Sequence, residues 1–307
     1  MILYIELLIN VLHLGQHYNC VLVIQEQRIV VIEKVYQQYC KRIYRNHKHR
    51  RGTWRIKHTL TQIIDSRLEP FENPPKSIFD EEWNNLFILD AARHDLYEEV
   101  EGETEKRTTL AGQSTEYIEK NFSEGDFSDI VYVTANPFFS EKQFEELTGR
   151  KPEEVFHEVF HTYQTDWNTE HNTVMPEALI RDAKTARKLF PDKKIIVHFM
   201  QPHYPFVNSK FTDEGIRPDL DHEKEGFSLW ELAETGKYDR EELWDAYRKN
   251  LELVLPKAKK LAEELGGKTV ITADHGNFVG EKGLYGHPRG VKAKQVREVP
   301  WHVIENE

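Results

Sequence analysis

The chain has 307 residues, of which 39% are hydrophobic and 30% charged, and its formal net charge is −11. This length accommodates one large α/β domain with additions, or two smaller domains, and the apolar share is sufficient for a buried core. A net negative charge of this size disfavours general nucleic-acid binding, because the polyanion would be repelled over most of the surface.

The first forty residues contain both cysteines, Cys20 and Cys40, and neither lies in a CxxC pair. Two isolated cysteines are no disulfide framework, so a reducing compartment is expected. The apolar run over 1–14 is interrupted by Glu6 and Asn10, is too short to span a bilayer, and lacks the basic start and cleavage site of a signal peptide. These features predict a soluble, cytoplasmic protein.

Residues 41–58 form a basic arm, in which eight Lys or Arg side chains alternate with histidines and aromatic residues. The simpler interpretation is a solvated segment, and the alternative is weak contact with an anionic membrane or another polyanion. Three prolines in 69–77 predict a linker. The predicted organisation is an N-terminal extension over 1–68, a linker over 69–83 and a catalytic domain over 84–307.

After the linker, apolar runs typical of strands alternate with segments of helical periodicity. The expected strands are 86–90, 129–136, 195–200 and 269–273, and the expected helices are 175–190 and 243–265. Pro176 fits the first turn of one helix, and Pro256 predicts a kink in the other. The alternation predicts an α/β fold with a mostly parallel central sheet and helices on both faces. The charged stretch 207–240 is predicted to be an insertion over one end of the sheet.

Three expected strands are followed by residues of metal-ligand type, which are Asp90, His203 and the adjacent Asp274 and His275. In open α/β sheets, ligands bind outside the carboxyl ends of the strands, so these residues are expected to converge. Taken alone, a strand-terminal Asp is more often a helix cap, and a histidine in QPHYPF is more often a turn residue. The Asp-His pair before Gly276 is a stronger signal, because a glycine lets the chain turn tightly over an ion.

The segment DHGNFVGEKGLYGHP runs from Asp274 to His287 as one glycine-rich loop. Here the sequence resembles the alkaline phosphatase superfamily, in particular its sulfatase and phosphoethanolamine-transferase branches. Those transferases carry a DHG segment, a glycine-rich loop and a His at this separation, and also an H-x4-H segment like the one from His198 to His203. The resemblance covers about residues 84–304, and its motifs follow the family's order.

The resemblance implies a site for two divalent metal ions. The implied ligands are Asp90, Ser114, Asp274 and His275 for one ion, and His203 and His287 for a second, more weakly held ion. Carboxylate and imidazole ligands together suit zinc, with manganese as the alternative. Two ions can stabilise both the attacking and the leaving oxygen of an in-line displacement.

The family also needs a Ser or Thr nucleophile at a helix N-terminus after the first acid. Ser114 and Thr115 in LAGQSTEYIEKNF are the two candidates. Ser114 is preferred because it precedes the helical run TEYIEKNF, and Thr115 stays the alternative nucleophile. The free N–H groups of the first helical turn would receive the phosphoryl oxygens. An ordinary helix cap is the competing interpretation.

Arg93 and Asn136 are predicted to bind the substrate. Arg93 would form paired hydrogen bonds from its guanidinium to a phosphate, and Asn136 would donate one hydrogen bond. The competing interpretations are an ion pair between Arg93 and Asp95 and a turn formed by Asn136 before its proline. His198, inside its strand, is interpreted as structural.

Two departures from the family narrow the prediction. Ser114 lacks the Pro and Arg that follow the nucleophile of formylglycine sulfatases, and the chain shows neither the transmembrane helices nor the disulfides of the phosphoethanolamine transferases. The sequence therefore predicts a metal-dependent hydrolase or transferase that acts on phosphate or sulfate esters of a small molecule, glycan or lipid. The alternative is a non-catalytic protein of the same fold that binds a membrane or polyanion through its basic arm.

Overall fold

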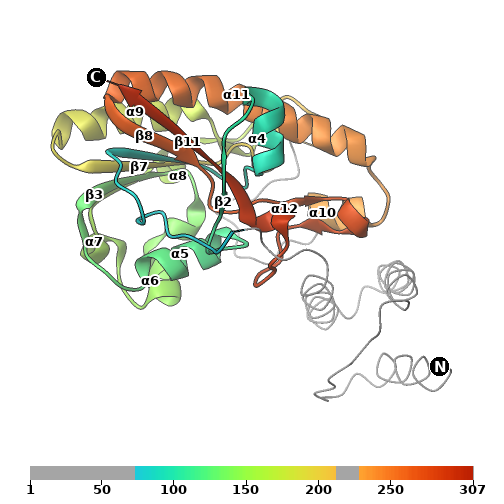
Figure 1. The fold of residues 1–307 in the computed structure, drawn as a ribbon, viewed down its shortest axis with the longest axis horizontal. Helices are drawn as coiled ribbons and strands as arrows, with labels where there is room; N and C mark the ends of the chain where they lie inside the picture. Colours follow the sequence, from blue (N-terminus) through green and yellow to red (C-terminus); the bar gives the residue numbers. More distant parts are fainter. Residues whose placement is uncertain (1–72, 212–227, 307) are drawn as a thin grey trace, which may run out of the picture. The chain divides into compact units, whose positions relative to one another are not determined.

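The computed structural model of the chain describes residues 73–211 and 228–306. A seven-stranded sheet with the strand order β2-β11-β8-β1-β7-β3-β4 runs through this part of the chain (Figure 1). Its strands are β1 (Asn85–Leu89), β2 (Glu105–Thr108), β3 (Phe127–Thr134), β4 (Phe156–His161), β7 (Lys194–Phe199), β8 (Gly267–Thr272) and β11 (Glu298–Asn306). The pairs from β8 to β4 are parallel, and β11 is antiparallel to both its neighbours. The predicted mostly parallel sheet is confirmed.

Helices cover both faces of the sheet, as Figure 1 shows. On one face pack α4 (His94–Glu101), α9 (Pro176–Leu189) and α11 (Arg240–Leu265), and on the other pack α5 (Ser114–Phe122), α6 (Glu141–Thr148) and α7 (Pro152–Val155). Within β1, Phe87 belongs to the core under α9 and α11, whereas Leu86 and Ile88 belong to the core under α5 and α6. Burial on both faces explains why this strand is apolar from Leu86 to Leu89.

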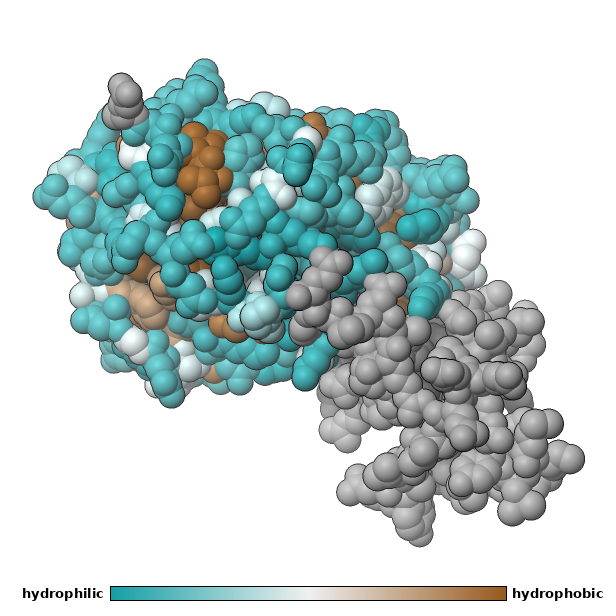
Figure 2. Space-filling view, in the orientation of Figure 1, coloured by the Kyte–Doolittle hydropathy of each residue, from teal (hydrophilic) through white to brown (hydrophobic). Residues whose placement is uncertain are grey.

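The shorter elements lie in the connections between these strands and helices. They are η2 (Pro137–Phe139), α8 (Thr162–Thr165), β5 (Trp167–Asn168), β6 (Thr173–Val174), α10 (Leu229–Glu234), β9 (Phe278–Val279), η3 (Glu281–Gly283), β10 (Tyr285–Gly286) and α12 (Lys294–Arg297). The described surface seen in Figure 2 is mainly hydrophilic, with isolated apolar patches.

The two predicted helices begin and end close to the expected residues. α9 starts at Pro176. An N–H in the first turn of a helix has no acceptor within the helix, so a proline there costs no hydrogen bond. α11 continues as one element through Pro256, where a kink was expected. It ends at Leu265, and the following Gly266 adopts a φ of 68°.

Several sequence predictions concern residues outside the described part of the chain. The N-terminal extension over 1–68 with its basic arm at 41–58 lies there, as does 212–227 of the expected insertion. Within the described residues, no helix combines the length and the apolar character that crossing a membrane requires.

Candidate active site and metal centre

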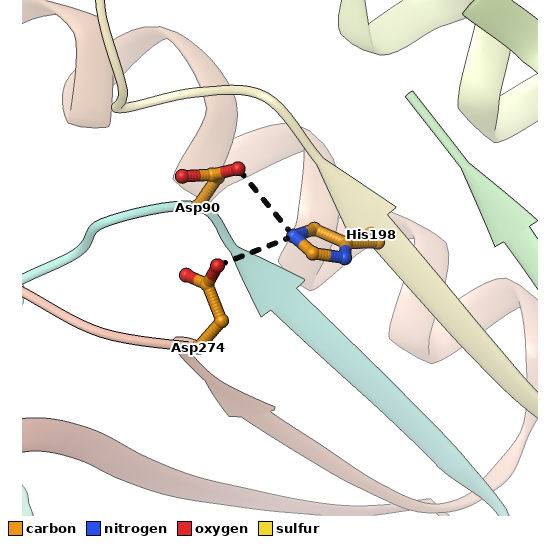
Figure 3. Close-up of side chains that lie close together, drawn as sticks. All are labelled: Asp90, His198 and Asp274. Atoms are coloured by element: carbon orange, nitrogen blue, oxygen red, sulfur yellow. Dashed lines mark ion pairs between the residues drawn. The ribbon is translucent and has the colours of Figure 1, made fainter. Parts of the chain in front are cut away.

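The candidate site lies at the carboxyl ends of four neighbouring strands, β8, β1, β7 and β3. Asp90 directly follows β1, and Asp274 follows β8 by two residues. His198 lies in β7, paired with Ile88 of β1, and Asn136 follows β3 by two residues. Because the four strands are parallel, their carboxyl ends meet at one edge and bring these side chains together. Figure 3 shows Asp90, His198 and Asp274 there.

Asp90 and Asp274 are two buried carboxylates, with exposed fractions of 1% and 0%. Oδ1 of Asp274 accepts hydrogen bonds from the backbone N–H of Ala91 at 3.0 Å and of His275 at 2.9 Å. Oδ2 of Asp90 accepts one from Nδ2 of Asn136 at 2.9 Å, while its Oδ1 has no hydrogen-bond partner among the described residues. Two buried carboxylates this close are unfavourable unless a positive charge offsets them, so the site suits a cation.

Ser114 is the first residue of α5, and its hydroxyl lies between these carboxylates. Its Oγ donates to Oδ2 of Asp274 at 2.8 Å and lies 3.5 Å from Oδ2 of Asp90 and 3.3 Å from Nε2 of His275. The hydroxyl of Thr115 instead accepts a hydrogen bond from Gln113 at 2.5 Å. Of the two predicted nucleophiles, Ser114 is the one that the structure places at the acids.

Four histidines border the carboxylates, and three of them use Nδ1 to bond a carbonyl oxygen. The pairs are His203 with Tyr204 O at 2.5 Å, His275 with Gly276 O at 2.7 Å and His287 with Asn277 Oδ1 at 2.7 Å. A carbonyl oxygen only accepts, so each of these Nδ1 atoms carries the proton and each Nε2 keeps its lone pair. An Nε2 lone pair is what a metal ligand needs.

Burial and neighbouring side chains shift the pKa values of Asp90, His203 and His287. Burial alone would raise the pKa of Asp90, but the nearby imidazoles, His203 first, outweigh it and hold that pKa below its ordinary 3.8. Burial lowers the pKa of His203 below 6.5. Burial, together with His275 and His203 close by, lowers the pKa of His287 well below 6.5. An ionised carboxylate and neutral imidazoles are the forms that bind a metal ion.

Three donor atoms of the site have spacings compatible with one divalent ion. A tetrahedral zinc ion with bonds of about 2.1 Å holds its ligand atoms about 3.4 Å apart. In this structure Oγ of Ser114, Oδ2 of Asp274 and Nε2 of His275 lie 2.8–3.4 Å from one another, and Asp90 meets this set through two oxygens, Oδ2 at 3.5 Å from Ser114 and Oδ1 at 3.8 Å from His275. The unpaired Oδ1 of Asp90 and Nε2 of His198 are buried atoms that a cation would satisfy.

The two residues predicted to hold a second ion lie beside the first set. The ring centroids of His203 and His287 are 5.1 Å apart, and those of His275 and His287 are 4.5 Å apart. All six residues predicted as ligands are therefore brought to one place by five separate segments of the chain.

Arg93 forms the ion pair with Asp95 that was the competing interpretation for it. Its guanidinium donates to both carboxylate oxygens of Asp95, at 2.8 and 2.5 Å, to Asn277 O at 3.0 Å and to Oε1 of Glu281 at 2.6 Å. With these bonds it ties α4 to the DHG loop, and its role in binding a phosphate stays a prediction. Asn136, the other predicted substrate ligand, directs its amide at Asp90.

Two residues of the site were missed or set aside from sequence. His198, interpreted as structural, has its Nε2 3.6 Å from Oδ2 of Asp90 and 3.8 Å from Oδ2 of Asp274 (Figure 3). The signal that could have found it is its position one residue before the end of β7, near the carboxyl ends of the strands that carry the site. Asn277 orients His287, and no sequence signal beyond its place after the DHG segment distinguishes it.

No protein-family model matches the chain, and neither does any curated protein. Among solved structures, the soluble domain of lipooligosaccharide phosphoethanolamine transferase A from Neisseria meningitidis is 12% identical, with a TM-score of 0.46 over 74% of this chain and 79% of that one. For the integral membrane form of that transferase, also 12% identical with a TM-score of 0.46, the match covers 89% of this chain and 59% of that one.

Two further solved structures are similar at lower TM-scores. The C-terminal periplasmic domain of a phosphoethanolamine transferase from Campylobacter jejuni is 14% identical over 72% of this chain and 78% of that one, with a TM-score of 0.44. A protein in the alkaline phosphatase superfamily from Vibrio parahaemolyticus is 12% identical over 81% and 68%, with a TM-score of 0.38. These structures belong to the groups whose motifs the sequence resembles.

The expected cytoplasmic location is wrong on this comparison, because the similar Campylobacter jejuni domain is periplasmic. The expectation rested on Cys20 and Cys40 and on the interrupted apolar run over 1–14, all outside the described residues. Counting cysteines failed for a physical reason. A domain of this size can bury a core large enough to fold without disulfides, so isolated cysteines do not distinguish a reducing from an oxidising compartment.

Proposed function

We propose that the chain is a metal-dependent enzyme that transfers phosphoryl groups from ester substrates through Ser114. The observation that carries the proposal is the position of Ser114 Oγ, within 3.5 Å of two buried carboxylates and of His275 Nε2. A serine that merely capped a helix would accept a hydrogen bond from a backbone N–H. Ser114 donates to Asp274 instead, and α5 has no side-chain cap.

The ligands of this proposal come from residues that already hold one another in place. They would be Asp90, Ser114, Asp274 and His275 for one divalent ion, with zinc favoured over manganese, and His203 and His287 for a second. Bound there, such ions would lower the pKa of the Ser114 hydroxyl and offset the charge of the phosphoryl oxygens. Asn136 and two backbone N–H groups fix the carboxylates before any ion binds.

The chemistry of the protein's own residues is a double displacement at phosphorus. Ser114 Oγ gives up its proton to solvent and forms a bond to phosphorus as the bond from phosphorus to the ester oxygen breaks, and the leaving oxygen takes up a proton from solvent. The first-turn N–H groups of α5 would receive the phosphoryl oxygens. An acceptor hydroxyl then loses its proton and forms a bond to phosphorus as the bond to Ser114 Oγ breaks, which restores the serine hydroxyl with a proton from solvent. Water as acceptor makes the enzyme a hydrolase, and an alcohol on a small molecule, glycan or lipid makes it a transferase.

The test of this function compares Ser114→Ala with Thr115→Ala on p-nitrophenyl phosphate, its diester and its sulfate, each with zinc and with manganese. We expect Ser114→Ala to lower turnover at least about 10³-fold, because the bond-forming oxygen is removed. Thr115→Ala is the matched control, since its hydroxyl lies one residue away and contacts Gln113.

Metal content of the same proteins is measured in parallel. Ser114→Ala should retain bound metal, because the two carboxylates and His275 remain. A Ser114→Ala protein that turns over all three esters as fast as the unaltered chain would refute covalent catalysis by this serine.

A further inference from the structure

His198 differs from the other three histidines of the site in what its Nδ1 contacts. Nδ1 lies 3.0 Å from the hydroxyl of Tyr132, which can donate or accept, whereas the other three meet a carbonyl oxygen. Its Nε2 has no hydrogen-bond partner among the described residues, and the side chain is 0% exposed. An imidazole nitrogen buried in this way is costly unless something binds it.

The ring is held so that Nε2 faces Asp90 and Asp274 (Figure 3). Tyr117 and Phe139 each present a ring 5.9 Å from that of His198 at nearly right angles, and Tyr132 lies 6.2 Å away. Packed among three aromatic rings, the imidazole cannot turn its Nε2 away from the carboxylates without displacing the core.

The distances distinguish a shared ion from a hydrogen bond. Nε2 lies 3.6 Å from Oδ2 of Asp90 and 3.8 Å from Oδ2 of Asp274. A hydrogen bond from a ring nitrogen to a carboxylate spans about 2.7–3.2 Å, so neither contact is one. Two ligand atoms bonded to the same ion at about 2.1 Å stand roughly 3–4 Å apart, which matches both distances.

We propose that His198 is a further ligand of the first ion, that Tyr132 accepts the proton of its Nδ1, and that this second imidazole makes the site select zinc over manganese. The inference rests on the proposed function and deepens it. With His275 as the sole imidazole the set is mostly oxygen, which manganese tolerates, and a second imidazole favours zinc. Tyr132 acts as the hydrogen-bond partner that orients a ligating histidine.

The experiment titrates the full chain, after removal of metal, with zinc and separately with manganese in competition with a chromophoric chelator. His198→Gln keeps a donor near the position of Nε2 but is a poor ligand. We expect its zinc affinity for the first equivalent to fall at least about 10-fold and its manganese affinity to fall less, so the zinc-to-manganese ratio drops. Tyr132→Phe, which keeps the ring, should lower zinc affinity in the same direction.

Phe139→Leu is the control for packing, because it alters a ring that packs on His198 and leaves in place the Tyr132 hydroxyl that bonds Nδ1. We expect an unchanged zinc-to-manganese affinity ratio. Thermal melts of the metal-free proteins show which variants fold. If His198→Gln does not fold, the zinc and manganese affinities of Tyr132→Phe test the proposal.

The outcomes separate this inference from the proposed function. If the unaltered chain binds neither ion, the proposed metal-dependent function fails, and the inference fails with it. If the unaltered chain binds zinc but His198→Gln, or Tyr132→Phe in its place, binds both ions with unchanged affinities, His198 is not a ligand. The proposed function then stands.

Discussion

The side-chain amide of Asn277 fixes the tautomer of His287. Oδ1 of Asn277 accepts from Nδ1 of His287 at 2.7 Å, and Nδ2 donates to Phe278 O at 3.1 Å, which determines which end of the amide is oxygen. Asn277 is 1% exposed, so water does not compete for this bond. A single buried amide therefore leaves Nε2 of His287 with its lone pair toward the site.

Replacing Asn277 tests whether this hydrogen bond matters for the second ion. Asn277→Leu removes the acceptor while keeping similar volume, so His287 loses its fixed tautomer. We expect the affinity for the second equivalent of zinc to fall about 10–100-fold, with the first equivalent little changed. Calorimetric titration measures both. Asn277→Asp keeps an acceptor oxygen and should retain most of the second affinity, and an equal loss in both variants would contradict this role for the amide.

At the scale of elements, the DHG turn packs closely against the backbone of α12. The N–H of Gly276 donates to Val296 O at 2.9 Å, and a Cβ on Gly276 would stand 2.3 Å from Gln295 O and 3.1 Å from Cγ of Arg93. A backbone oxygen cannot move aside as a flexible side chain can. Glycine is needed here because of a close approach of two backbones.

Gly276→Ala should therefore displace the loop that carries Asp274 and His275. We expect a loss of about 1–3 kcal/mol in the free energy of unfolding from the clash, together with loss of tight zinc binding. Gly149→Ala is the control for the stability change. It sits at a φ of 73° with open space around it, so it should cost about 1–2 kcal/mol of backbone strain while zinc binding persists. Urea unfolding and zinc titration of both variants measure this, and a Gly276→Ala protein that binds zinc normally would show that the turn tolerates displacement.

At the scale of the whole molecule, the buried histidines couple stability to pH. The pKa values of His203 and His287 lie below 6.5 in the folded protein and near 6.5 in the unfolded chain. Between those values the unfolded chain binds more protons, so the free energy of unfolding falls as the pH falls below about 6.5. Asp90, whose pKa is lowered from 3.8, adds a further loss at more acidic pH.

We therefore expect the metal-free protein to lose stability between pH 7.5 and pH 5.5, measured by urea unfolding with a chelator present. A double variant, His203→Gln with His287→Gln, should show a smaller loss over the same interval, because two of the responsible groups are gone. The same pH dependence in both proteins would place its origin elsewhere in the chain.

The basic arm at 41–58 is the largest cationic feature of an otherwise acidic chain, and it lies outside the described residues. Each Lys or Arg near an anionic membrane contributes about 1 kcal/mol, and salt screens this attraction. We expect weak co-sedimentation of the full chain with anionic liposomes at low salt, lost at high salt. Changing the eight cationic residues of the arm to Gln should abolish it, whereas Ser114→Ala should not. Equal recovery of all three proteins would leave the arm a solvated segment.

The sequence by itself determined the framework of this protein. Alternating apolar runs and helical segments are local patterns, so the strands that end before Asp90 and Asp274 and the helix that begins at Pro176 are predictable from neighbouring residues alone. Parallel strands then require the residues after them to share one edge of the sheet, and for this reason the convergence of Asp90, His203, Asp274 and His275 follows from their positions in the chain. The places of Ser114 and His287 were expected from the family resemblance.

The tertiary structure alone decided which way the side chains at that edge point. Ser114 and Thr115 are adjacent and chemically alike, and the packing of α5 on the sheet directs one hydroxyl to the acids and the other to Gln113. Arg93 pairs with a loop 184 residues away in sequence, and His198 is turned to Asp90 and Asp274 by aromatic rings from other elements. Such choices depend on packing between segments far apart in the chain, which no local pattern records.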